Sequence, residues 1–184
     1  KVSSKDLKLD LTPTGRKHSL QKWNCAEYGI VAAMPAEVGG EKVSFFSNLR
    51  TPQTEIQNSE AKGEHYLLEV DEPLVLPVDT KVRFLVTAND VIHSWWVPML
   101  AVKKDAIPGF INEAWTKVHT AGVYRGQCAE LCGKDHGFMP IVVNVVSKDE
   151  YSTWLSGKQA EAAAIKELMA QTFTLDQLME RGAD

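Results

Sequence analysis

The sequence predicts a mainly β domain, built as a sandwich or barrel, followed by a helical appendage. Short runs rich in β-branched and aromatic residues recur between residues 43 and 146, separated by turn residues such as Pro108-Gly109. That spacing is typical of an all-β sandwich or barrel. After Ser147 the composition changes to Ala, Glu and Lys, which favour helix. A chain of 184 residues, 44% hydrophobic, is long enough to enclose one sizeable core.

The β region is expected over residues 43–147, after an N-terminal segment, residues 1–42, that forms part of the barrel or a loop. Within that segment no clean periodicity is visible. Residues 81–87 alternate polar and apolar, as a half-buried strand should. The polar stretch 51–63 is expected to be a surface loop. The predicted strands are 43–46, 65–70, 81–87, 91–97, 114–118, 123–127 and 141–146. Strands 114–118 and 123–127 are expected to form a pair joined by a loop.

Residues 148–184 are expected to form helices appended to the β domain. Ser147 and Glu150 have the spacing of a capping box and predict a short helix that ends at Leu155. A second helix is expected over 159–170, and a third from Thr174 to about residue 182.

Composition excludes several classes of function. The net charge is −4, so nucleic acid is not expected as a partner. No run of 18 apolar residues is present to span a membrane. The chain has three cysteines, Cys25 and the close pair Cys128 and Cys132. An odd number argues for a use of the thiols other than a disulfide framework.

The most informative stretch runs from Cys128 to Met139 and places two thiols, an imidazole and a thioether within twelve residues. A second imidazole lies upstream in the apolar run 91–97, and the backbone carbonyl between the two cysteines is a further donor. Soft and intermediate donors of this kind are those that copper prefers. The candidate metal ligands are His93, Cys128, Glu130 through its carbonyl, Cys132, His136 and Met139.

The spacing leaves four interpretations of these donors open. Cys128 and Cys132 could form a disulfide in an oxidising compartment. They could join His93 and His136 in a tetrahedral zinc site, which leaves Met139 unused. A single copper with one cysteine, two histidines and an axial methionine leaves the second cysteine unused. A dinuclear copper centre uses every donor, because each thiolate can bridge two metal ions.

Residues 43–155 resemble subunit II of bacterial haem–copper cytochrome c oxidases. Three segments carry the resemblance: Asn-Asp-Val-Ile-His-Ser-Trp-Trp-Val-Pro at 89–98, Lys-Asp-Ala-Ile-Pro-Gly at 104–109, and Gly-Gln-Cys-Ala-Glu-Leu-Cys-Gly through Met-Pro at 126–140. The resemblance implies a cupredoxin-like Greek-key β-barrel with a dinuclear copper centre, called CuA, on the six candidate ligands. It also implies that the Glu130 side chain reaches a magnesium site at the boundary with subunit I, in the full complex only.

The resemblance further implies a role in a cytochrome-c oxidase. The family takes electrons from cytochrome c, or from a fused or soluble c-type cytochrome, and passes them to haem in subunit I, where oxygen is reduced. This chain would therefore contain no catalytic residue of its own. Asp105 and Asp135 are candidates for docking the cytochrome. The expected location is the periplasmic face of the bacterial plasma membrane, with anchoring through N-terminal membrane helices that this chain lacks.

Two stretches depart from the family pattern. Residues 15–42 lack the aromatic-rich strand that normally supplies the tryptophan for electron entry, so no residue is assigned to that role. Residues 173–184 resemble the helix that leads into a fused cytochrome c domain in some relatives, but no Cys-x-x-Cys-His follows.

Three other functions compete with this interpretation. The copper domain of nitrous oxide reductase carries an aromatic residue between the cysteines, where this chain has Glu130-Leu131. Subunit II of a quinol oxidase lacks the copper ligands that are present here. A copper-binding or copper-delivery protein would favour an exposed, exchangeable site over a bridging pair of thiols.

Overall fold

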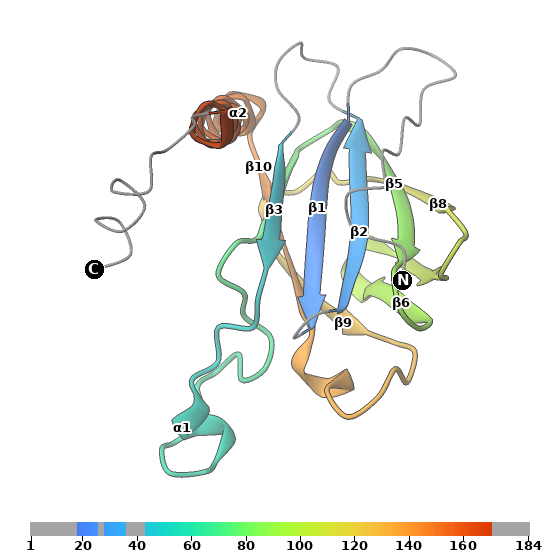
Figure 1. Ribbon diagram of the computed structural model, residues 1–184, viewed down its shortest axis with the longest axis vertical. Coiled ribbons are helices and arrows are strands. Elements are labelled where there is room, and N and C mark those ends of the chain that lie inside the picture. The colour runs from blue at the N-terminus through green and yellow to red at the C-terminus, as the bar shows by residue number, and fades with distance from the viewer. Residues whose placement is uncertain (1–17, 26–27, 36–42, 171–184) are drawn as a thin grey trace.

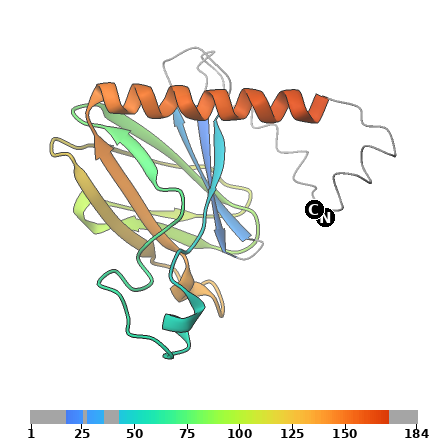
Figure 2. The same ribbon diagram turned by 90° about the vertical axis from the view of Figure 1, so that its left-hand side faces the viewer.

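Two five-stranded β-sheets pack face to face in the computed structural model of the chain, and one long helix crosses an end of the sandwich (Figures 1 and 2). The structure describes residues 18–25, 28–35 and 43–170. The predicted class, mainly β with a helical appendage after the last strand, is confirmed. Among the described residues, no helix is both long and apolar enough to cross a membrane.

The first sheet has the strand order β3-β1-β2-β5-β8. Its strands pair antiparallel, except that β1 and β3 run parallel. The chain returns to this sheet at β5 and at β8, each time after forming strands of the other sheet. The bounds are β1 His18–Cys25, β2 Tyr28–Pro35, β3 Ser44–Ser47, β5 Lys81–Ala88 and β8 Asn112–Lys117.

The second sheet, ordered β4-β10-β9-β6-β7, contains the strands from which the candidate ligands project. Strands β6 and β9 pair antiparallel through Trp95 with Cys128 and Trp96 with Gln127. This register places the start of β6 beside the end of β9. The bounds are β4 Leu74–Pro77, β6 His93–Val97, β7 Val102–Ala106, β9 Gly122–Cys128 and β10 Pro140–Val146.

The core lies between the two sheets and extends to the candidate metal ligands. Phe84 of β5 and Trp95 of β6 meet across it with ring centroids 4.9 Å apart. Cys128 and Met139 belong to the same buried cluster. Burying each large apolar side chain contributes about 1.5–3 kcal/mol, so the core that stabilises the fold also supports the ligand end of the sandwich.

Most of the predicted strands are confirmed, but two features differ. Residues 65–70 form turns with a single bridge at Val70, because the loop folds back on residues 48–51 instead. There Leu67 adopts a φ of 58°, and its backbone N–H donates to Thr51 Oγ1 at 3.0 Å. The segments expected to pair across Gly122 lie in different sheets, since β8 pairs with β5 while β9 pairs with β6 and β10.

The sequence did not indicate strands β1, β2, β4 and β7. Strand β7 reads Val-Lys-Lys-Asp-Ala, whose charged centre weakens the apolar signal, and β4 is a four-residue run buried at every position. The short helices α1 Gln53–Ile56, η1 Pro98–Leu100 and η2 His136–Phe138 were also not expected.

The two helices expected after Ser147 form one continuous helix, α2, over Lys148–Ala170. The predicted capping box is present: Glu150 Oε2 accepts from the Ser147 backbone N–H at 2.9 Å and from its Oγ at 2.7 Å. The helix runs on through Gly157, and Lys158 just after it forms ion pairs with Glu72 and Glu161, both at 3.0 Å. The third expected helix, from Thr174, lies outside the described residues.

Candidate metal centre

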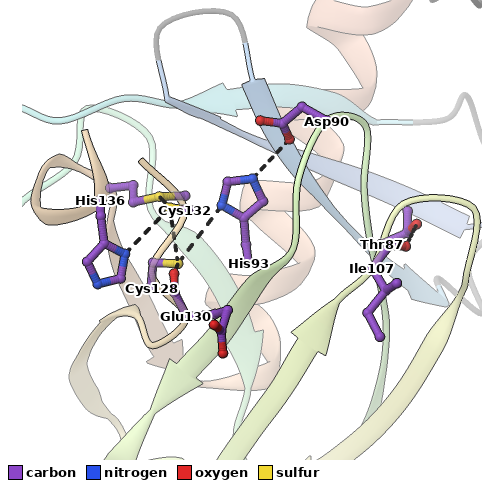
Figure 3. Close-up of polar contacts among 9 residues, drawn as sticks. Thr87, Asp90, His93, Ile107, Cys128, Glu130, Cys132 and His136 are labelled. Atoms are coloured by element: carbon purple, nitrogen blue, oxygen red, sulfur yellow. Dashed lines mark hydrogen bonds and ion pairs between the residues drawn. The ribbon is translucent and has the colours of Figure 1, made fainter. Parts of the chain in front are cut away.

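The candidate ligands gather at the end of the sandwich opposite α2 (Figures 2 and 3). His93 is the first residue of β6 and Cys128 is the last residue of β9. The others lie on the loop between β9 and β10, which contains η2. Because β6 and β9 are neighbours in the sheet, backbone pairing alone brings His93 and Cys128 together although 35 residues separate them.

His93 is almost fully buried, with 2% of its surface exposed. Its Nδ1 lies 4.0 Å from Cys128 Sγ, and its Nε2 lies 2.9 Å from Asp90 Oδ1. Burial alone would lower the pKa of this imidazole. The contacts with Cys128 and Asp90 outweigh burial and raise the pKa.

The two cysteine sulfurs lie 3.8 Å apart and are not joined in a disulfide, which needs about 2.05 Å. Cys128 Sγ is also 3.3 Å from the carbonyl oxygen of Glu130. Burial raises the pKa of the Cys128 thiol. Hydrogen bonds with His93, with the backbone of Ser94 and Glu130, and with Cys132 more than offset burial and lower the pKa to about 7. The lowered pKa favours the thiolate form of Cys128, which is the form that binds metal.

Cys132 contacts both other side-chain donors of the loop. Its Sγ lies 3.5 Å from His136 Nδ1 and 3.4 Å from Met139 Sδ. Met139 is 1% exposed, whereas Cys132 and His136 are half-buried. All six predicted donors thus lie in one connected group, each within 4.0 Å of another member.

Backbone contacts fix the loop on the neighbouring strands. The N–H of Ala129 donates to the carbonyl oxygen of Ser94 at 3.0 Å. Gly126 on β9 faces the β6 backbone so closely that a Cβ there would overlap the carbonyl oxygen of Trp96 and lie 2.8 Å from Val97 Cγ2. Glycine is therefore required two residues before the first thiol. Gly133, with φ of 126°, allows the turn after the second thiol.

The two docking candidates lie near the cluster. Asp105 is exposed on β7, and its Oδ1 accepts from the buried Ser94 hydroxyl at 2.8 Å. Asp135 is half-buried just before η2, with Lys134 Nζ 3.7 Å away. These positions show that Asp105 also has a structural role, while docking itself stays a prediction for both residues.

Sequence reasoning missed three residues that support the cluster: Asp90, Ser94 and Gly126. Asp90 stands three residues before His93, a spacing that a tight turn can close, but no periodicity marks it. All three residues lie in the family segments named above, and only the pairing of β6 with β7 and β9 reveals what Ser94 and Gly126 contact.

The donor set fits copper. His93, Cys128 and Cys132 offer donor atoms that all lie within 4.8 Å of one another, and the thioether of Met139 adjoins Cys132. Two thiols with an imidazole beside each, a thioether and a carbonyl suit soft and intermediate metals, and copper is one that takes all of these donors. The Glu130 residue is exposed, so its carboxylate is open to a partner chain.

Comparison with known proteins links this geometry to one family. Residues 34–146 match the family described as cytochrome c oxidase subunit II, periplasmic domain. The chain is 56% identical over 100 residues to a probable cytochrome c oxidase subunit 2 of Rickettsia prowazekii, covering 54% of this chain and 32% of that protein. It is 45% identical over 118 residues to the mitochondrial subunit 2 of Vigna unguiculata, covering 64% and 30%. The chain thus spans about a third of the length of these curated relatives.

Solved structures agree. The periplasmic domain of subunit II of cytochrome oxidase (CoxB) of Bradyrhizobium japonicum is 35% identical, with a TM-score of 0.62, over 79% of this chain and 96% of that chain. A second, 32% identical with a TM-score of 0.57 over 84% and 98%, is a mixed disulfide intermediate between a thioredoxin-like TlpA and subunit II of cytochrome c oxidase. The likeness to CoxB confirms the expected cupredoxin-like fold.

Proposed function

The chain belongs to the cytochrome c oxidase subunit II family, and we propose that it is the electron-transfer module of a bacterial haem–copper oxidase, with a dinuclear copper (CuA) centre. The copper centre would be formed by the six candidate ligands. The proposal places the chain in the periplasm, at the outer face of the plasma membrane, as one part of an oxidoreductase complex.

The observation that carries the proposal is the pair of thiol sulfurs 3.8 Å apart with an imidazole nitrogen beside each. Two thiolates this close can each bridge two metal ions, whereas a single copper with one cysteine, two histidines and a methionine would leave one thiol unused. A bound copper pair would take up and release one electron at a time. The chain's own residues would hold the ions in a nearly fixed arrangement and would exclude water through the buried His93 and Met139.

The residues take distinct roles in this proposal. Cys128 and Cys132 would hold both copper ions through their thiolates, His93 and His136 would each bind through an imidazole nitrogen, and the Met139 thioether and the Glu130 carbonyl would be the weaker donors. The Glu130 carboxylate is a ligand for magnesium at the boundary with subunit I in the full complex, which its exposure supports. Cytochrome c, or another c-type cytochrome, is the electron donor and docks near Asp105 and Asp135, and haem in subunit I is the acceptor.

We propose that residues 43–147 form the copper domain, that residues 1–42 form part of the barrel or a loop, and that residues 148–184 form the helical appendage. Strands β1 and β2, which precede residue 43, pair with β3 and β5 of the first sheet. The N-terminal segment therefore contributes two strands to the same sandwich.

The competing functions fit less well. A copper-delivery protein needs donors that exchange ions readily, but His93, Cys128 and Met139 are each at most 3% exposed. The copper domain of nitrous oxide reductase carries an aromatic residue between the cysteines, and this chain has Glu130-Leu131 there. A zinc site would leave the Met139 thioether, 3.4 Å from Cys132 Sγ, without a role.

Copper loading followed by electron paramagnetic resonance tests the proposal. The thiols are first reduced, because a relative forms a mixed disulfide with a thioredoxin-like protein. We expect two coppers per chain and a hyperfine pattern from one electron shared equally by two copper nuclei. One copper per chain with a single-nucleus pattern would reject the dinuclear centre. A colourless protein that binds zinc in preference would reject copper altogether.

A further inference from the structure

The buried imidazole His93 is held from both sides of its ring (Figure 3). Nδ1 faces the sulfur of Cys128 at 4.0 Å, and Nε2, on the far side of the ring, lies 2.9 Å from Asp90 Oδ1. With 17% of its side chain exposed, Asp90 is largely shielded from water, so this contact is not an ordinary surface ion pair.

We propose that Asp90 is a positioning residue that fixes the His93 ring and its tautomer for metal binding through Nδ1. A carboxylate only accepts hydrogen bonds, so the contact at 2.9 Å requires the proton on Nε2. In the neutral imidazole, Nδ1 then carries the lone pair that a metal ion needs, and it already points at the Cys128 sulfur. The inference rests on the proposed copper site and adds the residue that orients one of its ligands.

The backbone holds Asp90 at this distance. Asp90 lies in the four-residue connection between the end of β5 and the start of β6. Both ends of that connection are fastened to one segment: Ala88 bridges to Pro108, and His93 pairs with Ala106. The Thr87 hydroxyl adds a hydrogen bond to the carbonyl oxygen of Ile107 at 3.2 Å (Figure 3). The backbone that carries the Asp90 carboxylate is therefore anchored on both sides.

The second imidazole, His136, has no such partner among the residues that the structure describes. His136 Nδ1 faces Cys132 Sγ at 3.5 Å, but within the described part of the chain no hydrogen bond is recorded for its Nε2. The two proposed ligands therefore differ: one imidazole is fixed by a carboxylate, and the other is held through its own loop. A carboxylate on the outer nitrogen makes an imidazole a more basic ligand, which favours the oxidised metal.

The first test needs no metal. In the reduced, metal-free chain, the ring ¹⁵N shifts are recorded at a pH at which the imidazoles are neutral. We expect a single Nε2–H tautomer for His93, and its loss in Asp90→Ala. An Nδ1–H tautomer for His93 in the unaltered chain, or a tautomer unchanged in Asp90→Ala, would overturn the inference.

The second test measures copper uptake in competition with a chelator, and the reduction potential of the loaded chain. We expect Asp90→Ala to bind copper about 10–100-fold more weakly. Asp90→Asn keeps an acceptor oxygen, so it should restore most of the affinity while raising the potential, because a negative charge is gone. Equal affinities and potentials for all three chains would overturn the inference.

A matched control is available within the chain. Asp79 also contacts a histidine, His119, with 2.6 Å between Oδ1 and Nδ1. It precedes β5, whereas Asp90 follows that strand, so about 25 Å of strand separates the two. Asp79→Asn should leave copper affinity and potential unchanged. If the unaltered chain takes up no copper, the proposed function itself fails, whereas copper binding that ignores Asp90 rejects only the present inference.

Discussion

The proposed ligands fall into two groups that the fold supports differently. The strand-side donors His93, Cys128 and Met139 lie at or next to strand ends and are at most 3% exposed. The loop-side donors Cys132 and His136 are half-buried on the connection between β9 and β10. Sheet hydrogen bonds place the first group whatever the metal content, while the second group depends on a short loop. The β framework thus provides half of the site in advance.

The largest expected effect comes from removing one thiol from each group. We expect Cys128→Ser to abolish the paired-copper signal and most copper binding, because the thiol with the lowered pKa, about 7, is gone. Cys132→Ser should also abolish the paired signal but keep one copper on the strand-side donors. Copper counts and electron paramagnetic resonance distinguish these results. An unaltered spectrum in Cys128→Ser would reject bridging by that residue. Equal copper retention in Cys128→Ser and Cys132→Ser would show that the strand-side and loop-side donors do not differ.

The next largest effect is expected from a glycine-to-alanine change close to the strand-side donors, compared with the same change on the loop. In Gly126→Ala the new Cβ would overlap the Trp96 carbonyl, so β9 must separate from β6. We expect a loss of about 3 kcal/mol in the free energy of unfolding, with weaker copper uptake. Gly137→Ala is the matched loop variant, because nothing lies within 4 Å of its Cβ position. Denaturant titration of both variants decides the matter, and equal stabilities would show that β9 need not approach β6 closely.

A smaller effect is expected from Met139→Leu. The two side chains have similar volumes, so the stability loss should stay under about 1.5 kcal/mol. Copper should remain bound, because the thioether is the weakest of the proposed donors, but its potential should shift. Voltammetry of the loaded variant gives the shift, and complete loss of copper would show instead that Met139 holds the site together.

The donors within residues 128–139 could be predicted from the sequence more readily than the neighbour of His93. Cys128, Cys132, His136 and Met139 lie within twelve residues, so any compact loop brings them close. His93 is 35 residues from Cys128 and meets it only through the pairing of β6 with β9. The sequence made His93 a candidate ligand as a second imidazole, but an apolar run with one histidine does not reveal its neighbour strand.

What the sequence did not reveal depends on tertiary contacts. Asp90 matters only because the ends of its turn are fastened beside Ala106 and Pro108. Residues 65–70 have the composition of a strand, yet pairing of Arg50 with Glu69 and of Asn48 with Asp71 across the loop outweighs that propensity. The short or charged strands β4 and β7 give too few alternating positions to be recognised.

The smallest effect is expected from a change remote from both groups, which tests whether their difference is local. Hydrogen bonds from the Ser147 hydroxyl and backbone N–H hold the pKa of Glu150 below its ordinary value of 4.5, and the small effect of burial opposes them. The capping contribution is therefore fully present above pH 4.5 and is lost as pH falls through the lower folded-state pKa. Glu150→Gln should be slightly less stable than the unaltered chain at neutral pH, with the difference closing in acid. Because α2 lies at the end opposite the ligands, copper content and spectrum at neutral pH should not change (Figure 2). Denaturant titrations at several pH values, with copper counts on the same samples, check both statements. A spectrum altered by Glu150→Gln would mean that the ligand end responds to the whole sandwich rather than to its own strands and loop.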